Sequence, residues 1–280
     1  VLGTACVGAA GFARLGDARR AELPDALARA RGVRRVALAA DAVTAYAGAL
    51  GSRPSAVLAA GTGLIAIGTD LTGWRRADGW GHLLGDCGGG AWIGRAGLEA
   101  ALRAHDGRAG GSTALLRCAE EQFGPVRQLP GLLYPRTDRA AVRASFAPRV
   151  ADLSADDPVA ADILRAAARH MADSAAGVCP VDGTPEVALT GGLSRMGDPL
   201  LVPLREELAR RLPHARQVPP EGDPLHGAVR IAAELAAGRL TLPGEPTMLH
   251  VTAATRKRAD KSGRIPLTCT LPEQDHPGNQ

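Results

Sequence analysis

The sequence predicts an α/β protein that begins with a parallel sheet and continues into a mixed, helix-rich part. Three observations support this. Two apolar runs, residues 4–9 and 33–40, each precede a helical pattern, which is the strand–helix order of a parallel sheet. After Gly51, two further apolar runs flank Gly61-Thr62-Gly63, as in an antiparallel hairpin with a glycine turn. From residue 91 onward, helical patterns dominate.

The first fifty residues form the parallel unit. The run TACVGA, residues 4–9, ends in small residues, which favours a buried strand. A helix is expected over residues 18–31, because Leu23 and Leu27 fall on one face. The second strand is VRRVALAA, residues 33–40. Asp41 stands at its end, where a second helix begins.

The rest of the chain alternates short strands with longer helices. The expected elements are a hairpin over 55–74, a short strand at 74–77, helices at 91–105, 112–123, 138–151 and 158–178, a proline-rich loop at 124–138, a strand from 185, a helix ending near 212 and a last helix at 224–237. Asp156 or Asp157 is expected to cap the helix that starts at Pro158. Beyond about Leu249 the tail is rich in Pro, Thr and charge and is expected to be disordered.

Composition narrows the classes of function. The chain has 280 residues, 45% of them apolar, which supports a sizeable core. No basic leader opens the chain and no apolar run approaches the roughly 20 residues of a membrane span. We therefore expect a cytoplasmic protein with no membrane partner. The net charge is +4, but the basic residues alternate with Asp and Glu, so no nucleic-acid partner is predicted.

Cysteine and histidine usage gives no metal site. The five cysteines are far apart and never form a CxxC pair, so we expect free thiols rather than disulfides or a zinc centre. The seven histidines show no metal-binding spacing. No residue is assigned as a metal ligand.

One stretch is unusual in composition. Residues 79–94, GWGHLLGDCGGGAWIG, hold seven glycines and two of the three tryptophans around the single acid Asp86. Taken alone, Asp86 is a turn-forming residue, and Gly61-Thr62-Gly63 and Gly191-Gly192 are ordinary structural turns. Such turns can also gather backbone N–H groups into a concavity that binds phosphate. Asp41 is either a helix N-cap or a ligand-binding acid at the carboxyl edge of the sheet.

Taken together and in this order, these pieces resemble a family. Asp41 between strand and helix, the GTG hairpin, DGWGHLLGDCGGGAWIG and LTGGLS (189–194) are similar to the N-acetylglucosamine kinases and BadF/BadG-type ATPases of the actin, sugar kinase and Hsp70 superfamily. The resemblance covers about residues 1–236. It implies a ribonuclease H-like, actin/hexokinase-type fold of two domains, with an incomplete N-terminal domain at 1–52, a C-terminal domain at 53–240 and a disordered tail at 241–280.

The resemblance also implies a role for each matching residue. Asp41 matches the catalytic aspartate, which accepts the proton of the attacking sugar hydroxyl. Gly61, Thr62 and Gly63 match the second phosphate loop. The residues matching the sugar-binding segment are Gly79, Trp80, Gly81 and Asp86, and those matching the adenosine-binding turn are Gly191 and Gly192. The implied reaction is ATP- and Mg²⁺-dependent phosphorylation of a hexosamine such as N-acetylglucosamine or glucosamine.

Some features depart from the family pattern. The acidic, glycine-rich first phosphate loop of the DxGGT kind does not occur before residue 41, so we expect a truncated N-terminal domain and little activity from this chain alone. The sheet edges that this leaves apolar make a homodimer one expectation. Leu64 stands where the family usually has Ser, and Cys87 where it usually has Glu.

Two other readings of the resemblance remain open. One is a BadF-type ATPase that activates a partner enzyme, although no cysteine pair suited to a subunit-bridging iron–sulfur cluster stands out. The other is a non-catalytic sugar-sensing or scaffold protein that has lost the first phosphate loop.

Overall fold

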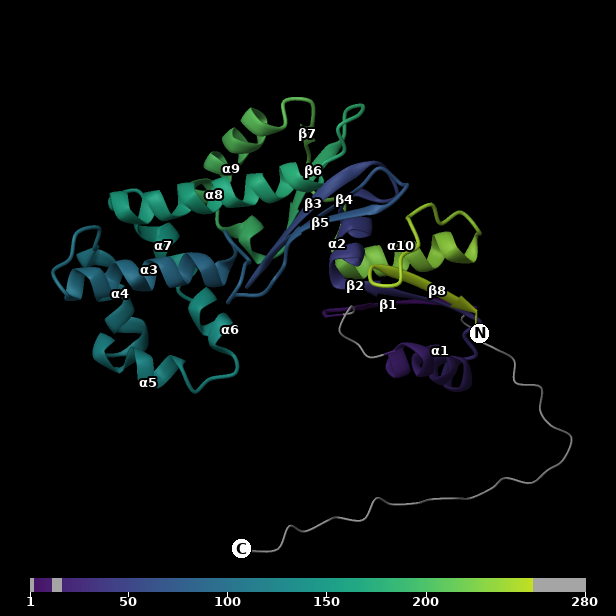
Figure 1. Ribbon diagram of the computed structural model, residues 1–280, viewed down its shortest axis with the longest axis horizontal. Coiled ribbons are helices and arrows are strands. Elements are labelled where there is room, and N and C mark those ends of the chain that lie inside the picture. Colours follow the sequence, from purple (N-terminus) through teal and green to yellow (C-terminus); the bar gives the residue numbers. More distant parts are fainter. Residues whose placement is uncertain (1–2, 12–16, 254–280) are drawn as a thin grey trace, which may run out of the picture.

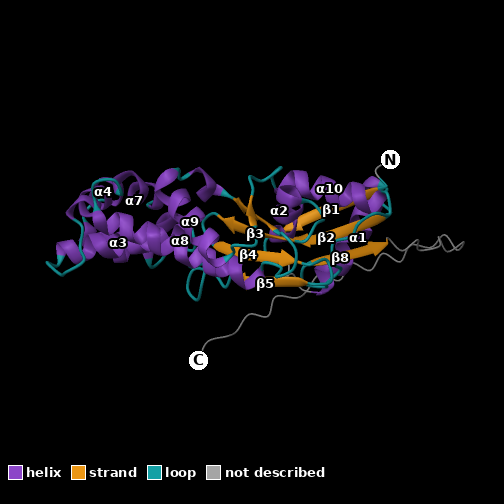
Figure 2. Cartoon of the chain, turned by 90° about the horizontal axis from the view of Figure 1, so that it is seen from above, coloured by secondary structure: helices purple, strands orange, loops and turns teal. Residues whose placement is uncertain are grey.

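The computed structural model describes residues 3–11 and 17–253, which form two sheets surrounded by helices (Figures 1 and 2). The first sheet has the order β1-β2-β8, in which β1 (Thr4–Ala9) runs parallel to β2 (Arg35–Ala40) and β8 (Leu249–Ala253) runs antiparallel to β2. Helix α1 (Asp17–Arg31) connects β1 to β2, and α2 (Asp41–Leu50) follows β2 directly. The predicted strand–helix–strand–helix unit is therefore present.

The second sheet has five strands in the order β5-β4-β3-β6-β7. Its strands are β3 (Ser55–Ala60), β4 (Leu64–Thr69), β5 (Trp74–Asp78), β6 (Glu186–Thr190) and β7 (Arg216–Gln217). Strand β3 pairs antiparallel with β4, as the glycine hairpin predicts, and parallel with β6. In the β3–β6 register Ala59 lies opposite Thr190, so the glycine turns that follow both strands lie at the same edge of the sheet.

Helices cover this second sheet and extend beyond it. They are α3 (Gly90–His105), α4 (Thr113–Phe123), α5 (Leu129–Leu133), α6 (Arg139–Ala144), α7 (Ala147–Leu153), α8 (Pro158–Val178) and α9 (Asp198–Arg211). Helix α10 (Pro224–Ala236) packs on α2 and on the first sheet instead. Asp157 caps α8 by accepting hydrogen bonds from the N–H groups of Val159 and Ala160, which confirms one of the two predicted caps. None of the helices in the described part is long and apolar enough to cross a membrane.

The helix predicted over residues 138–151 is in fact two helices. Helix α6 ends at Ala144 and α7 begins at Ala147. A continuous helix would need an N–H at residue 148 to bond the carbonyl of Ala144, and residue 148 is a proline. The loop predicted at 124–138 also differs, because it contains a 3₁₀ turn (Val126–Gln128) and the short helix α5.

The C-terminal segment also differs from the prediction. Strand β8 lies within the segment from residue 241 that the sequence predicts to be disordered, and α10, assigned to the second domain, packs on α2 and on β1. The strand was missed because LHVTA is short and polar neighbours follow it. It forms by pairing with the free edge of β2. The last 27 residues, 254–280, lie outside the described residues, and the division into two domains stays a prediction.

Helix α2 packs between the two sheets. Its fully buried Tyr46 belongs to one core cluster with Ala37 of β2 and Val57 of β3. The Tyr46 ring meets Trp74 of β5 edge to face, with the ring centroids 5.2 Å apart. On its other side α2 approaches α10 so closely that a Cβ on Gly48 would collide with the carbonyl of Asp223. Glycine is required there because two backbones touch.

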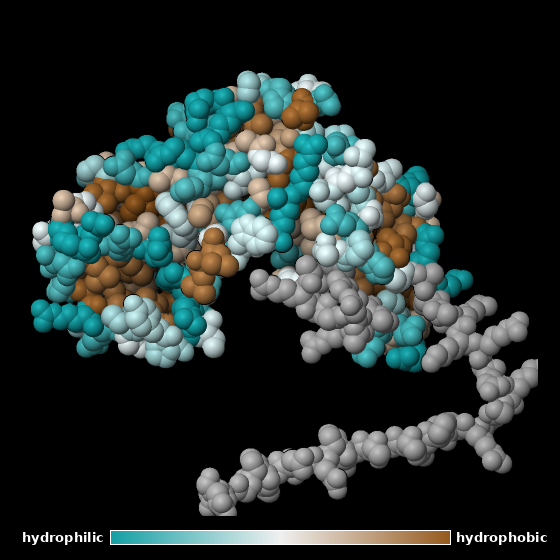
Figure 3. Space-filling model, in the orientation of Figure 1, coloured by the Kyte–Doolittle hydropathy of each residue, from teal (hydrophilic) through white to brown (hydrophobic). Residues whose placement is uncertain are grey.

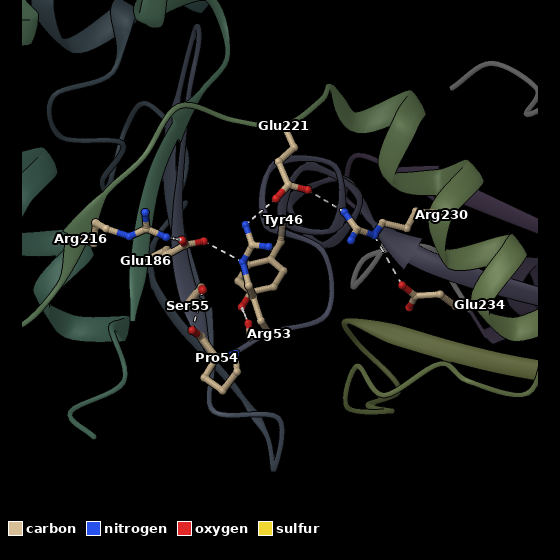
Figure 4. A network of polar contacts seen from close by, with 9 residues as sticks. All are labelled: Tyr46, Arg53, Pro54, Ser55, Glu186, Arg216, Glu221, Arg230 and Glu234. Carbon is tan, nitrogen blue, oxygen red and sulfur yellow. Dashed lines mark hydrogen bonds and ion pairs between the residues drawn. The ribbon is translucent and has the colours of Figure 1, made fainter. Parts of the chain in front are cut away.

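A chain of ion pairs joins the two sheets at the end opposite the glycine turns (Figure 4). Arg53, in the connection from α2 to β3, pairs with Glu186 at the start of β6 at 2.7 Å and with Glu221 at 2.6 Å. Glu221 also pairs with Arg230 of α10 at 3.0 Å. The network lowers the pKa of Glu221 through its hydrogen bonds to Arg53 and Arg230. It ties the second sheet to α10, which packs on the first.

Candidate active site

Three glycine-rich segments that are remote in the chain meet at one edge of the second sheet. The Gly61-Thr62-Gly63 turn receives two hydrogen bonds from the start of α3, Gly90 N–H to the Gly61 carbonyl and Ala91 N–H to the Thr62 carbonyl, both at 2.8 Å. Gly191 lies against the backbone of Ala60, the residue before the turn. Thr62 and Gly191 are both exposed, so packed helices do not cover these turns.

Bare backbone at Gly191 is a physical requirement. Its φ of +91° is rarely adopted by residues with a side chain, and a Cβ there would collide with the carbonyl of Ala60. By contrast, a Cβ on Gly61 or Gly192 would meet no backbone, because the first has nothing within 4 Å and the second only an arginine tip at 3.9 Å. Open space above exposed turns leaves room for a ligand.

Asp86 lies directly over the first of these turns. A Cβ on Gly63 would collide with the Asp86 carboxylate, which therefore rests on the bare backbone of that residue. The Asp86 Oδ1 atom accepts a hydrogen bond from the Gly81 N–H at 3.0 Å. Burial raises the pKa of Asp86, the hydrogen bond from Gly81 opposes this shift, and the charge of Asp78 adds to it. The carboxylate is thus half-buried and keeps acceptor capacity toward a ligand.

Asp78, to which the sequence assigns no role, organises this loop. Its Oδ1 accepts the Asp86 N–H at 2.5 Å and its Oδ2 accepts the Cys87 N–H at 2.8 Å. Both Asp78 and Asp86 have positive φ values, 58° and 56°, which Asp tolerates better than most residues. The position of Asp78 in the sequence could have indicated this role, because an acid at the end of a strand, directly before Gly-Trp-Gly, can hydrogen-bond the loop back to the sheet.

Gly79, Trp80 and Gly81, which the resemblance assigns to sugar binding, lie in the same loop as Asp86. Gly79 and Gly81 have φ values of +73° and +88°. Trp80 is 63% exposed, and the Arg76 guanidinium lies 4.8 Å from its ring centroid. Leu83 and Leu84 are also exposed. The segment therefore presents apolar and polar surface together.

Asp41 comes from the other sheet. It is the first residue of α2, and its exposed carboxylate accepts the Ala42 N–H at 2.8 Å, while Ala40 occupies the N-cap position. Because α2 leads from the end of β2 back to the start of β3, Asp41 and the glycine turn after β3 lie at the same end of the molecule. Figure 3 shows a hollow in the molecule beside the lobe that α3 to α6 form.

The two departures from the family pattern have local explanations. Leu64 is 2% exposed and points into the core below the second sheet, so it offers no group to a ligand. Cys87 is half-buried, and burial, together with the charges of Asp78 and Asp86, raises the pKa of its thiol. Its backbone N–H, rather than its sulfur, takes part in the loop. Cys6, Cys87, Cys118 and Cys179 are free thiols, as predicted.

The fold and the site define a class. Two sheets joined through a central helix, with glycine turns at one edge and an acid from each side, are the features of an actin/hexokinase-type α/β fold. The model of the BadF/BadG/BcrA/BcrD ATPase family matches residues 2–232, and the chain belongs to this family. This confirms both the predicted fold class and the resemblance.

Individual proteins are similar to this chain in sequence or in structure. The protein is similar to a Chromobacterium violaceum structure described as a candidate N-acetylglucosamine kinase, with a TM-score of 0.63 and 30% identity over 76% of this chain and 72% of that one. A Porphyromonas gingivalis protein described in the same way shares the fold, with a TM-score of 0.57 and 16% identity over 80% of this chain and 75% of that one. The chain is also 34% identical, over 104 residues, to a Clostridium acetobutylicum N-acetylmuramic acid/N-acetylglucosamine kinase. That match spans 37% of this chain and about a third (33%) of the relative.

Replacing Gly191 by Ala is expected to destabilise the protein by about 1–3 kcal/mol, because it combines an unfavourable φ with a collision against Ala60. Thermal or denaturant unfolding measures the loss. Gly131→Ala is the matched control, since a Cβ there meets nothing within 4 Å. Equal stability of the two variants would show that Gly191 is free to move away from Ala60.

Proposed function

We propose that this protein transfers the γ-phosphoryl group of ATP to a hydroxyl of an amino sugar of the N-acetylglucosamine or glucosamine type. The observation that supports this most directly is the contact between Asp86 and Gly63. It joins an acid suited to binding sugar hydroxyls to the turn suited to binding terminal phosphates. The sugar and the phosphoryl donor would then be neighbours, which is the main requirement of phosphoryl transfer.

In this proposal each residue has one task. The N–H groups of Thr62 and Gly63 and the Thr62 hydroxyl contact the terminal phosphates, and Gly191 and Gly192 leave room for the adenosine. The Gly61 N–H closes the turn instead, by donating to the Gly63 carbonyl at 2.9 Å. The Asp86 carboxylate accepts hydrogen bonds from two sugar hydroxyls beside Gly79, Trp80 and Gly81. Asp41 accepts the proton of the hydroxyl that attacks the γ-phosphorus.

The residues present also fit a magnesium ion bound with the nucleotide. Mg²⁺ keeps several waters and commonly binds through one or two carboxylates together with substrate phosphates. In residues 3–11 and 17–253 no group of three or more metal-ligating side chains comes together, so the described site offers no all-protein metal cage. Bound there, Mg²⁺ would neutralise developing phosphate charge, with Asp41 as the exposed acid at that edge.

The direct test is a coupled ADP-release assay on the full-length protein with N-acetylglucosamine, glucosamine and glucose, because little activity is expected from this chain alone. We expect ADP release that depends on an amino sugar, with the phosphorylated sugar identified by mass spectrometry. ADP release that is independent of any sugar would favour an ATPase that acts on a partner enzyme. Sugar binding without nucleotide binding in calorimetry would favour a sugar-sensing protein. Either result would contradict the proposal.

Sugar affinity is expected to fall on acidification at a higher pH than an ordinary aspartate would give. Only the ionised Asp86 can accept two sugar hydroxyls, and its pKa is raised, chiefly by burial. Binding should therefore be full at neutral pH and be lost as pH falls through this raised value. Calorimetric titration of N-acetylglucosamine between about pH 4 and 7.5 measures this. The Asp86→Asn variant should lack the step, and an identical pH profile in that variant would contradict the assignment.

A further inference from the structure

A cluster of arginines without acidic partners lies beside the loop that holds Asp86. Arg139 and Arg143 belong to α6 and Arg95 to α3. Among the described residues, no ion pair or hydrogen bond involves the side chains of these three arginines. The neighbouring Arg136 is different, since its Nε atom pairs with Asp138 Oδ1 at 2.7 Å. The α6 segment thus contains one compensated and two uncompensated positive charges.

Backbone contacts fix this cluster against the start of α3. Gly94 of α3 lies so close to the carbonyl of Arg143 that a Cβ there would collide with it. A Cβ on Gly90 would lie 3.3 Å from the Cβ of Ala144. Because Gly90 also binds the Gly61 turn, α6 is anchored next to the candidate site. Figure 1 shows α6 below the start of α3, near the tips of the second sheet.

Donor groups in this cluster lack acceptors. The Nε and Nη2 atoms of Arg143 are buried, and no hydrogen-bond partner reaches them in the described structure. The Nε2 atom of His82, in the loop between Gly81 and Asp86, is also buried and has no hydrogen-bond partner in the described structure. Buried donors left unpaired are costly, and a guanidinium pairs best with a planar or tetrahedral anion. The cluster therefore has the chemistry of an anion-binding site.

Electrostatics supports this interpretation. Burial lowers the pKa of Arg143, and the nearby charges of Arg95 and Arg139 lower it further. Burial also lowers the pKa of His82, with Arg143 and Arg139 as the next causes, while Asp86 opposes the shift. The charges of both Asp86 and the two α6 arginines therefore act on His82. Like charges held together in this way are stabilised by a bound anion.

We propose that Arg95, Arg139 and Arg143, with His82, form a subsite for an anionic substituent, a carboxylate or a phosphate, on the sugar whose hydroxyls Asp86 binds. The inference rests on the proposed function and extends it from neutral amino sugars to acidic ones. The subsite lies on the α6 side of Asp86, whereas Gly63 and the other glycine turns lie along the edge of the second sheet. The anion is therefore assigned to the sugar and not to the nucleotide.

Calorimetric titrations of the wild-type protein and of Arg143→Gln test the subsite. The probes are N-acetylglucosamine, N-acetylmuramic acid and an N-acetylglucosamine monophosphate. Removing one charged donor should weaken binding of the preferred anionic sugar roughly 10- to 100-fold and change binding of neutral N-acetylglucosamine less than about twofold. Whether the carboxylate or the phosphate sugar shows the loss identifies the anion. Arg149→Gln, an exposed arginine on α7, is the matched control and should change neither.

Arg139→Gln provides a second variant if Arg143→Gln unfolds, and thermal unfolding of both is measured alongside. Equal weakening for all three sugars, no weakening, or weakened ATP binding instead would overturn the subsite. If N-acetylglucosamine binds and is phosphorylated but the anionic sugars gain nothing from the arginines, the subsite fails and the proposed function stands. If no sugar binds to the wild-type protein, the proposed function fails together with the subsite.

Discussion

Replacing Asp41 by Asn is expected to lower kcat for sugar-dependent ADP release about 10²- to 10⁴-fold, the usual contribution of a general base. Asn retains the oxygen that accepts the Ala42 N–H and cannot accept a proton from the sugar hydroxyl. Helix α2 should therefore fold as before, and KM for ATP should change little. The coupled ADP-release assay measures the loss of turnover.

The matched control for this substitution is Asp70→Asn. Asp70 is an acid in the β4–β5 turn, where its carboxylate accepts hydrogen bonds from Thr72. Its replacement should leave turnover unchanged. Undiminished turnover in Asp41→Asn would exclude Asp41 as the base. A parallel loss of thermal stability would indicate a structural role for Asp41 in the first turn of α2 in place of a chemical one.

Substitutions of Asp78 and Asp86, the two acids of the loop that follows β5, are expected to differ in their effect on stability. Asp86→Asn should weaken sugar binding about 10- to 100-fold, because a carboxylate accepts two hydroxyls and an amide oxygen only part of that set. Its stability at neutral pH should be unchanged or slightly higher, since burial raises the pKa of Asp86 and the fold therefore disfavours its charge. Asp78→Ala should instead cost about 1–3 kcal/mol of stability, because two loop N–H groups lose their acceptor.

Calorimetry for sugar affinity and thermal unfolding for stability separate the two roles. Asp78→Ala should also weaken sugar binding, since the loop that presents Asp86 loses its attachment to the end of β5. A variant of Asp86 that unfolds easily but binds sugar normally would reverse the assignment. Asp70→Asn again serves as the control for loss of an exposed acid.

Much of the fold and part of the site could be predicted from the sequence, for local reasons. The alternation of strand and helix patterns predicted the parallel unit, and Gly61 with Gly63 predicted the hairpin. Both predictions succeed because turn chemistry and hydrophobic period act over a few residues. The glycines and acids of residues 78–94 indicated the family. Four features were missed: β8, the short helix α5, the packing of α10 on the first sheet and the break before α7. The first and third depend on a partner remote in the sequence.

The sequence by itself determined the order of elements, the glycine turns and the acids that stand next to them. Only the tertiary structure decided that Asp86 rests on Gly63, that Asp78 holds the loop that presents it, and that two donor nitrogens of Arg143 are buried with no hydrogen-bond partner among the described residues. The physical reason is the separation along the chain of the residues that interact. A turn or a strand is specified by neighbours along the chain, whereas the environment of a charge is set by whatever the fold packs around it.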